Sequence, residues 1–239
     1  MRVEHLAIDG SLVSVEADAD LSSDVTAAGW AMVPAMMRAH PFASFPAGHS
    51  SRLEDAVRSD RADVQVGPAE EYAMKGGTLR VAQVELPAAT GGARVLTVGA
   101  WEGQYGCLTT SISRAHPASL VEVFDTLDFD ESRRGLRIKS RVLPQPRPPE
   151  VLKEIPGVGL LNIRPATSTE LEACPRARGA LARHGELFRI RATSNALMFI
   201  TATAVVRVDP LAGSDPNQMV GVVEGLNVEW APRGALVHA

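Results

Sequence analysis

Cysteines, aromatic residues, lysines and long hydrophobic runs are all scarce in this sequence of 239 residues. Cys107 and Cys174 lie far apart, and neither has a second cysteine or a histidine at the spacing of a zinc site. They are expected to be buried small side chains or free thiols, with a disulfide as the alternative. No run approaches the roughly 18 consecutive apolar residues that predict a membrane-spanning helix. The opening "MRVEHLAIDG" has no apolar segment typical of a signal peptide, so a cytoplasmic protein without membrane insertion is expected.

Lysine is rare even among the basic residues. Of 24 lysines and arginines, only Lys75, Lys139 and Lys153 are lysines, which together with abundant alanine, glycine and proline is typical of a high-GC bacterium. The net charge of −4 argues against a general nucleic-acid binder, because such proteins are held by many phosphate contacts. A chain of this length with 45% hydrophobic residues can form a sizeable core without metals or disulfides.

No arrangement of residues predicts a catalytic centre. None of the six histidines has a second ligand at the spacing that directs two side chains to one metal ion. The segment "AGHSSRL" around Ser51 lacks the second glycine of a nucleophile elbow. Cys107 has only the distant His49 and His116 as possible bases, and any chain of this length offers such pairs. We therefore expect no catalytic residues, no metal and no cofactor.

The remaining glycine pairs and histidines are better explained as turn and helix-capping residues than as phosphate-binding or catalytic ones. Gly76-Gly77 and Gly91-Gly92 each precede an extended segment, which predicts hairpin turns instead of phosphate-binding loops. His116 precedes Pro117 and is expected to start a helix, and His184 is expected in a turn before a strand.

The first 40 residues predict a hairpin followed by a helix. "RVEHLAI" and "SLVSVEA" flank Asp9-Gly10, a pair that favours a two-residue turn with positive φ at both positions. Residues 22–40 space Val25, Trp30, Val33 and Met37 at helical intervals. Pro34 would interrupt such a helix, so we expect either one kinked helix or two short ones.

A three-stranded meander is expected from Thr78 to Ser113, where β-branched residues alternate strongly. "HPASLVEVFDTLDF" then places Leu120, Phe124 and Leu127 on one face of a helix that packs on this sheet. The strand, strand, helix order from Thr78 to Phe129 loosely resembles, in layout alone, the sheet-plus-helix scaffolds of the Mog1/PsbP type.

The second half of the chain predicts further strands. Extended segments are expected at 135–143, 157–165, 186–192, 196–209 and 219–230, with a short helix at 167–173. The fold class is therefore α+β, with mainly antiparallel sheets and a few packing helices. We expect a β-rich N-terminal half at 1–143, a proline-rich connector at 144–149 and a β-rich C-terminal half at 150–239. One continuous domain is the alternative.

Charge is distributed unevenly along the chain. Arg2 is the only basic residue among the first 26, which carry six acidic residues, whereas residues 132–149 contain no acid. In "GLRIKSRVLPQPRPPE" the basic residues alternate with apolar ones, as expected for a strand with one buried and one solvated face. The alternative is an interface, since uncompensated cations repel one another unless an acidic surface lies near. Asp125, Asp128 and Asp130 are expected to face the arginines just downstream. The candidate interface residues are Arg133, Arg134, Arg137, Lys139, Arg141 and Arg147.

These observations favour a non-enzymatic structural or assembly protein that acts through protein–protein contacts. It would belong to a homo- or hetero-oligomer and form part of a larger complex. The alternative is a small-molecule-binding protein or a hydrolase-like enzyme with a pocket near His49, Ser51 or Cys107.

Overall fold

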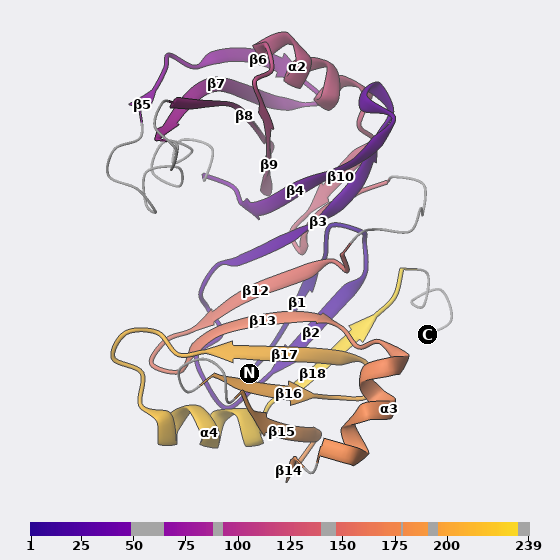
Figure 1. Ribbon diagram of the computed structural model, residues 1–239, viewed down its shortest axis with the longest axis vertical. Helices are drawn as coiled ribbons and strands as arrows, with labels where there is room; N and C mark the ends of the chain where they lie inside the picture. Colours follow the sequence, from indigo (N-terminus) through magenta and orange to yellow (C-terminus); the bar gives the residue numbers. More distant parts are fainter. Residues whose placement is uncertain (49–64, 88–92, 140–146, 178, 191–195, 234–239) are drawn as a thin grey trace. The chain divides into compact units, whose positions relative to one another are not determined.

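The computed structural model describes residues 1–48, 65–87, 93–139, 147–177, 179–190 and 196–233, with side chains except at positions 65 and 173–177 (Figure 1). More than half of the described residues lie in strands, which pair antiparallel, and three α-helices lie among them. The expected β-rich α+β fold is therefore confirmed. The chain divides into two compact units, unit 1 (Met1–Gly29 and Arg147–Ala239) and unit 2 (Trp30–Pro146). The division into halves at 144–149 stays a prediction.

Unit 1 begins with the predicted hairpin of β1 (Arg2–Leu6) and β2 (Leu12–Glu16). Its loop differs from the expected two-residue turn. The amide of Ala7 donates to the carbonyl of Ser11, and that of Gly10 donates to the carbonyl of Ala7, so three residues connect the strands. Only Gly10 has a positive φ, 85°, as in hairpins that end in a glycine bulge. The second edge of β2 pairs with β18 (Asn227–Ala231).

The larger sheet of unit 1 contains strands that are far apart in sequence. Its order is β14 (Ala180–Ala182), β15 (Gly185–Arg189), β16 (Leu197–Ile200), β17 (Ala204–Asp209), β13 (Gly159–Pro165) and β12 (Glu150–Ile155), followed by the start of β3 (Val25–Val33). Two bonds join the β16–β17 turn to β18: the Thr201 hydroxyl donates to the Val228 carbonyl, and the Trp230 amide donates to Thr203 Oγ1.

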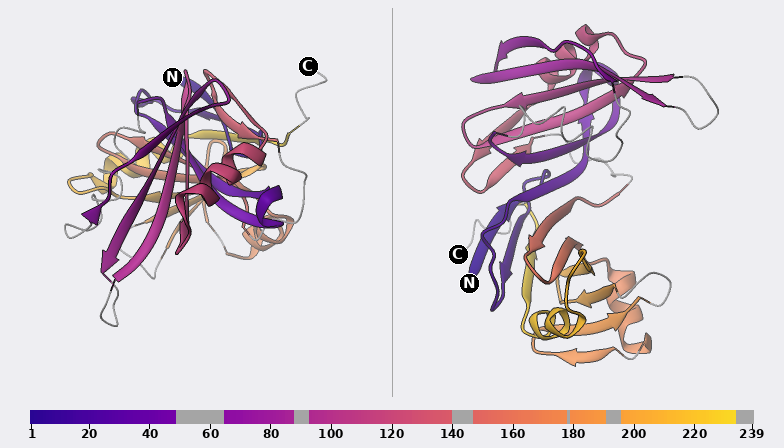
Figure 2. Two further views of the ribbon diagram at one scale, coloured as in Figure 1. Left: turned by 90° about the horizontal axis from the view of Figure 1, so that it is seen from above. Right: turned by 90° about the vertical axis from the view of Figure 1, so that its left-hand side faces the viewer.

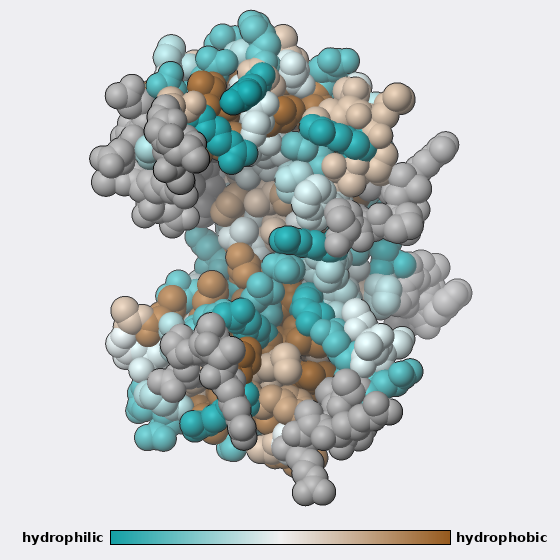
Figure 3. All heavy atoms as spheres, viewed as in Figure 1, coloured by the Kyte–Doolittle hydropathy of each residue, from teal (hydrophilic) through white to brown (hydrophobic). Residues whose placement is uncertain are grey.

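One face of this sheet forms the core of unit 1. Val151, Leu161 and Val206 alternate inward along their strands and are buried. On the opposite face, a row across the strands is half-buried or exposed: Leu152, Asn162, Arg207, Met198 and Phe188. Hydrophobic residues are visible over β13, β16 and β17 in the space-filling view (Figure 3).

Three predictions for the C-terminal segment need correction or extension. The segment 196–209 forms the two strands β16 and β17 because the chain turns at Thr201–Thr203. Residues 219–230 contain a helix end before the strand, since α4 (Pro216–Glu224) begins at the Asp215 cap. The short helix at 167–173 is confirmed and is longer than expected, α3 (Ser168–Ala177).

The helix predicted at 22–40 is wrong. This segment forms β3, the 3₁₀ turn η1 (Pro34–Met36) and β4 (Arg38–Pro46). Ala27, Gly29, Ala31 and Val33 are buried with a period of two, which defines a strand. Met37 closes the turn with φ of 49° and is 86% exposed.

The predicted meander and helix of unit 2 are confirmed. β7 (Gly77–Pro87), β8 (Ala93–Glu102) and β9 (Gly106–Ser113) pair in sequence, and β4 pairs with β9. β7 also pairs with β5 (Gln65–Val66) and β6 (Glu70–Met74). The helix α2 (Pro117–Thr126) packs on β7 and β8 (Figure 2). Its buried Leu120 and Phe124 face Gly99 of β8. The hairpin turn predicted at Gly76-Gly77 does join β6 and β7, but its two residues are Lys75 and Gly76, because Gly77 already pairs with Met74. Gly91-Gly92 lies outside the described residues.

Candidate interaction surface

The candidate site centres on a separate two-stranded sheet in unit 2, formed by β10 (Phe129–Ser132) and β11 (Gly135–Ile138). Arg133 and Arg134 form its turn, and both are exposed. Ser132 Oγ accepts from the Arg134 amide at 3.2 Å and donates to the Gly135 carbonyl at 3.2 Å. Gly135 has φ of 127°, a conformation accessible essentially only to glycine. The turn is therefore fixed by local bonds.

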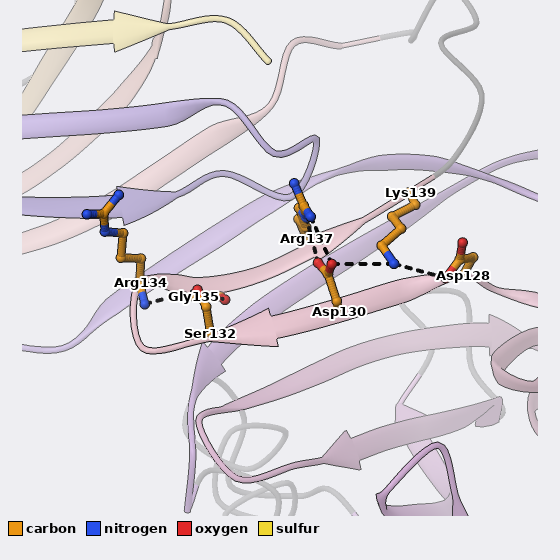
Figure 4. A network of polar contacts seen from close by, with 7 residues as sticks. All are labelled: Asp128, Asp130, Ser132, Arg134, Gly135, Arg137 and Lys139. Carbon is orange, nitrogen blue, oxygen red and sulfur yellow. Dashed lines mark hydrogen bonds and ion pairs between the residues drawn. The ribbon is translucent and has the colours of Figure 1, made fainter. Parts of the chain in front are cut away.

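Carboxylates of the same hairpin neutralise two of the candidate cations (Figure 4). The Arg137 guanidinium donates two parallel hydrogen bonds to the Asp130 carboxylate, from Nε at 2.6 Å and from Nη2 at 2.9 Å. Lys139 Nζ lies 3.4 Å from Asp130 Oδ2 and 3.8 Å from Asp128 Oδ1. The hydrogen bond from Arg137 lowers the pKa of Asp130, with the charges of Arg137 and Lys139 contributing. This arrangement confirms that Asp128 and Asp130 face the downstream basic residues.

The charge run is thus less basic than its sequence suggested. Between residues 128 and 139, four positive charges less three negative charges leave a net charge of +1. Within the described part of the chain, Arg133 has no ion-pair partner. Arg147 is exposed at the start of the second segment of unit 1, and Arg141 lies outside the described residues. Arg133 and Arg134 place two of these four positive charges at the exposed turn.

The other face of the hairpin is apolar and anchors it. Leu136 and Ile138 are buried, as their alternation predicted, whereas Val142 lies outside the described residues. Leu136 packs against Gly106, where a side-chain methyl would lie 3.7 Å from Leu136 Cβ. At the other end of β10, the rings of Phe129 and Trp101 pack edge to face, with 4.7 Å between their centroids.

Glu131 makes the most specific contact of the hairpin. Its carboxylate accepts three successive backbone amides of the β8–β9 turn, those of Gln104 at 2.8 Å, Tyr105 at 2.8 Å and Gly106 at 3.0 Å. Successive amides that converge on one anion form a nest. The hairpin is consequently joined to the β8–β9 turn by a charged bond as well as by apolar packing.

The alternative site around Cys107, His49 and Ser51 gains no support. Cys107 is buried with Val84, Val98 and Ala100, and burial raises the pKa of its thiol to about 12, with the charge of Glu102 contributing. Such a thiol is protonated at neutral pH and is a poor nucleophile. His49 and Ser51 lie outside the described residues, as does the side chain of Cys174. His116 caps α2, as predicted, because its Nδ1 accepts from the Ala118 amide.

Three titratable side chains that are buried or half-buried were not predicted from the sequence: Lys153, His40 and His5. Lys153 is 1% exposed, and its Nζ donates to the carbonyls of Leu21, at 2.7 Å, and Ser23. Burial lowers the pKa of Lys153 and, in β1, lowers that of His5 to about 4, with the charge of Lys153 contributing to the latter. In unit 2, burial lowers the pKa of His40. Nε2 of each histidine is buried without a hydrogen-bond partner among the described residues.

The signal for Lys153 was present in the sequence. In "EVLKEI", Lys153 occupies the same alternate positions as Val151 and Ile155, and all three are buried. A lysine in an apolar position of a strand therefore marked a buried amine.

The described residues contain no group of three or more His, Cys, Asp or Glu that could hold a metal ion. None of the described helices is long and apolar enough to cross a membrane. No family model, curated protein or solved structure matches the chain.

Proposed function

We propose that this is a non-enzymatic assembly protein that works through protein–protein contacts, with the β10–β11 hairpin as a contact element. The observation that carries this proposal is an exposed arginine turn on a hairpin that is fixed along its length. Glu131, Phe129 and Leu136 each attach the hairpin to other strands of unit 2. A preorganised element loses little conformational entropy when it binds a partner.

The ion pairs within the hairpin make its turn, and not its paired strands, the part that a partner would contact. Arg137 and Lys139 have carboxylate partners within the hairpin, so a partner protein would compete with Asp130 for them. Arg133 and Arg134 are exposed at the turn, where a partner can approach them. The same proposal includes oligomerisation through unlike charges and membership of a larger complex. It also includes a cytoplasmic location and the Mog1/PsbP-type layout.

Affinity capture from the native cells tests whether the turn binds a protein partner. The wild-type chain should retain a partner or a second copy, and Arg133→Ser with Arg134→Ser should reduce that retention at least tenfold. Retention should also decline with salt, because exposed charges are screened beyond about 8 Å at physiological ionic strength.

The matched control is Arg183→Ser with Arg189→Ser, which removes two exposed arginines of unit 1. Sedimentation of the eluted material gives the stoichiometry. Recovery of a lone monomer in all conditions, or equal losses in the two double variants, would contradict the proposal.

A further inference from the structure

We infer that Arg133 and Tyr105 form one docking surface for an acidic protein segment, and that Glu131 positions the two parts. This inference rests on the proposed function, since it names the class of partner that the hairpin turn would bind.

The first step is geometric. Arg133 follows Glu131 by two residues at the end of β10, and Tyr105 lies in the turn whose amides bind the Glu131 carboxylate. The Gly103 amide also donates to the Gly106 carbonyl at 2.9 Å, which closes the β8–β9 turn. Glu131 therefore fixes the backbone of Tyr105 beside the strand that leads to Arg133.

The second step is chemical. Tyr105 is 38% exposed, and Arg133 is exposed without an ion-pair partner among the described residues. Tyrosine and arginine are the side chains that most often contribute strongly to protein interfaces. A guanidinium matches the two oxygens of a carboxylate, and a phenol can donate to a third oxygen.

The third step excludes the nearby carboxylates as occupants. Glu131 is held by three amides, and Asp130 is held by Arg137. Lys139 lies next to both Asp128 and Asp130. These acids are engaged within unit 2, so the carboxylate that Arg133 would bind under this inference is one of a partner. An acidic protein segment fits better than nucleic acid, because a net charge of −4 opposes the many phosphate contacts that nucleic-acid binding needs.

Fluorescence anisotropy with the purified full chain tests the partner class. The probes are a labelled peptide of alternating Glu and Gly, a Lys and Gly peptide of equal length, and a single-stranded DNA oligonucleotide. We expect binding of the acidic peptide alone, with an affinity that falls as salt rises. Arg133→Ser should weaken it about tenfold and Tyr105→Ala several-fold, whereas Arg189→Ser should leave it unchanged.

Glu131→Gln separates positioning from simple electrostatics. This variant makes the chain less negative, so a pure charge effect would tighten acidic-peptide binding. Positioning predicts the opposite, a loss of at least threefold, with faster hydrogen exchange at the amides of Gln104, Tyr105 and Gly106. The control Asp125→Asn makes the same charge change on an exposed position of α2 and should not weaken binding.

The outcomes distinguish the inference from the proposed function. Equal or stronger DNA binding, or tighter peptide binding by Glu131→Gln, would overturn the docking surface. Absence of peptide binding, while capture of a native partner still depends on Arg133 and Arg134, would overturn the partner class and leave the proposed function standing. Absence of both would reject both.

Discussion

At the scale of single residues, the least expected side chains are charged or polar groups inside the units. Lys153 occupies a position where the alternation of β12 calls for an apolar residue, and it binds two carbonyls of the segment between β2 and β3. His5 and His40 gave no sequence signal, because a histidine that is buried by residues distant in sequence has no characteristic spacing. A lysine amid apolar alternation is recognisable in a sequence, whereas a buried histidine is not.

The half-buried ring of His5 should make stability depend on pH. Its pKa is lowered to about 4, whereas the pKa of a histidine in an unfolded chain is near 6.5. The unfolded chain therefore binds a proton first, and the free energy of unfolding should fall as the pH decreases from 6.5 to 4. For a half-buried ring we expect a loss on the order of 2 kcal/mol.

Urea unfolding at a series of pH values measures this loss. His5→Gln should remove much of the slope, and the remainder should reflect His40 and, toward pH 4, the carboxyl of Glu170, because both have lowered pKa values. His184→Gln changes an exposed histidine and should retain the wild-type slope. An unchanged slope in His5→Gln would show that the ring is not responsible.

Replacement of Lys153 by methionine should have two separable effects. The carbonyls of Leu21 and Ser23 lose a donor, which should cost about 1–3 kcal/mol in the free energy of unfolding. The positive charge that helps to lower the pKa of His5 also disappears, so that pKa should rise in an NMR titration. Lys139→Met removes a partly exposed amine of unit 2 and should leave the pKa of His5 unchanged.

At the scale of elements, local alternation predicted strands well where β-branched residues carried it. The meander β7–β9 and the apolar face of α2 were recognisable for this reason. The strand β3 was mistaken for part of a helix because three of its four buried positions are alanine or glycine, which give little periodic signal. The turn with positive φ at both positions is Lys75-Gly76, with φ of 50° and 74°, and not the Asp9-Gly10 loop.

The candidate site was predictable only in part. The run of cations, the apolar alternates Leu136 and Ile138, and the facing acids Asp128 and Asp130 follow from positions close in sequence. The contact of Glu131 with the β8–β9 turn does not, because it joins residues about 26 positions apart through backbone amides. Such a nest depends on the folded backbone and has no side-chain pattern.

Two glycines offer a matched test of how tightly α2 packs on the meander. A methyl group at Gly99 would lie 3.1 Å from the Phe124 ring and 3.2 Å from Leu120, so Gly99→Ala should destabilise the chain by about 1–2 kcal/mol. Gly221 of α4 has no neighbour within 4 Å of an added methyl, and Gly221→Ala should stabilise by about 0.5–1 kcal/mol. Chemical denaturation measures both, and the same sign for the two variants would contradict this packing.

At the scale of the whole molecule, one unit is built from two separated segments of the chain. β2 pairs with β18, and β3 pairs with β12, so residues 1–29 contribute strands to sheets that are otherwise formed by the segment 147–239. The compositional halves expected at 1–143 and 150–239 would instead group residues 1–29 with the meander. Local sequence patterns do not report which distant strands pair, so this difference calls for an experiment.

Replacing one buried tryptophan in each unit tests which segments unfold together. Trp230→Ala empties a buried site on β18 and should cost about 3–5 kcal/mol, as should Trp101→Ala on β8. Because local stability follows cooperative units, Trp230→Ala should accelerate amide exchange in β1, β2, β12 and β13 while β7–β9 stay protected. Trp101→Ala should do the reverse. If Trp230→Ala instead leaves β1 protected together with β7–β9, the chain unfolds by its sequence halves, and equal acceleration everywhere would mean that it unfolds as one block.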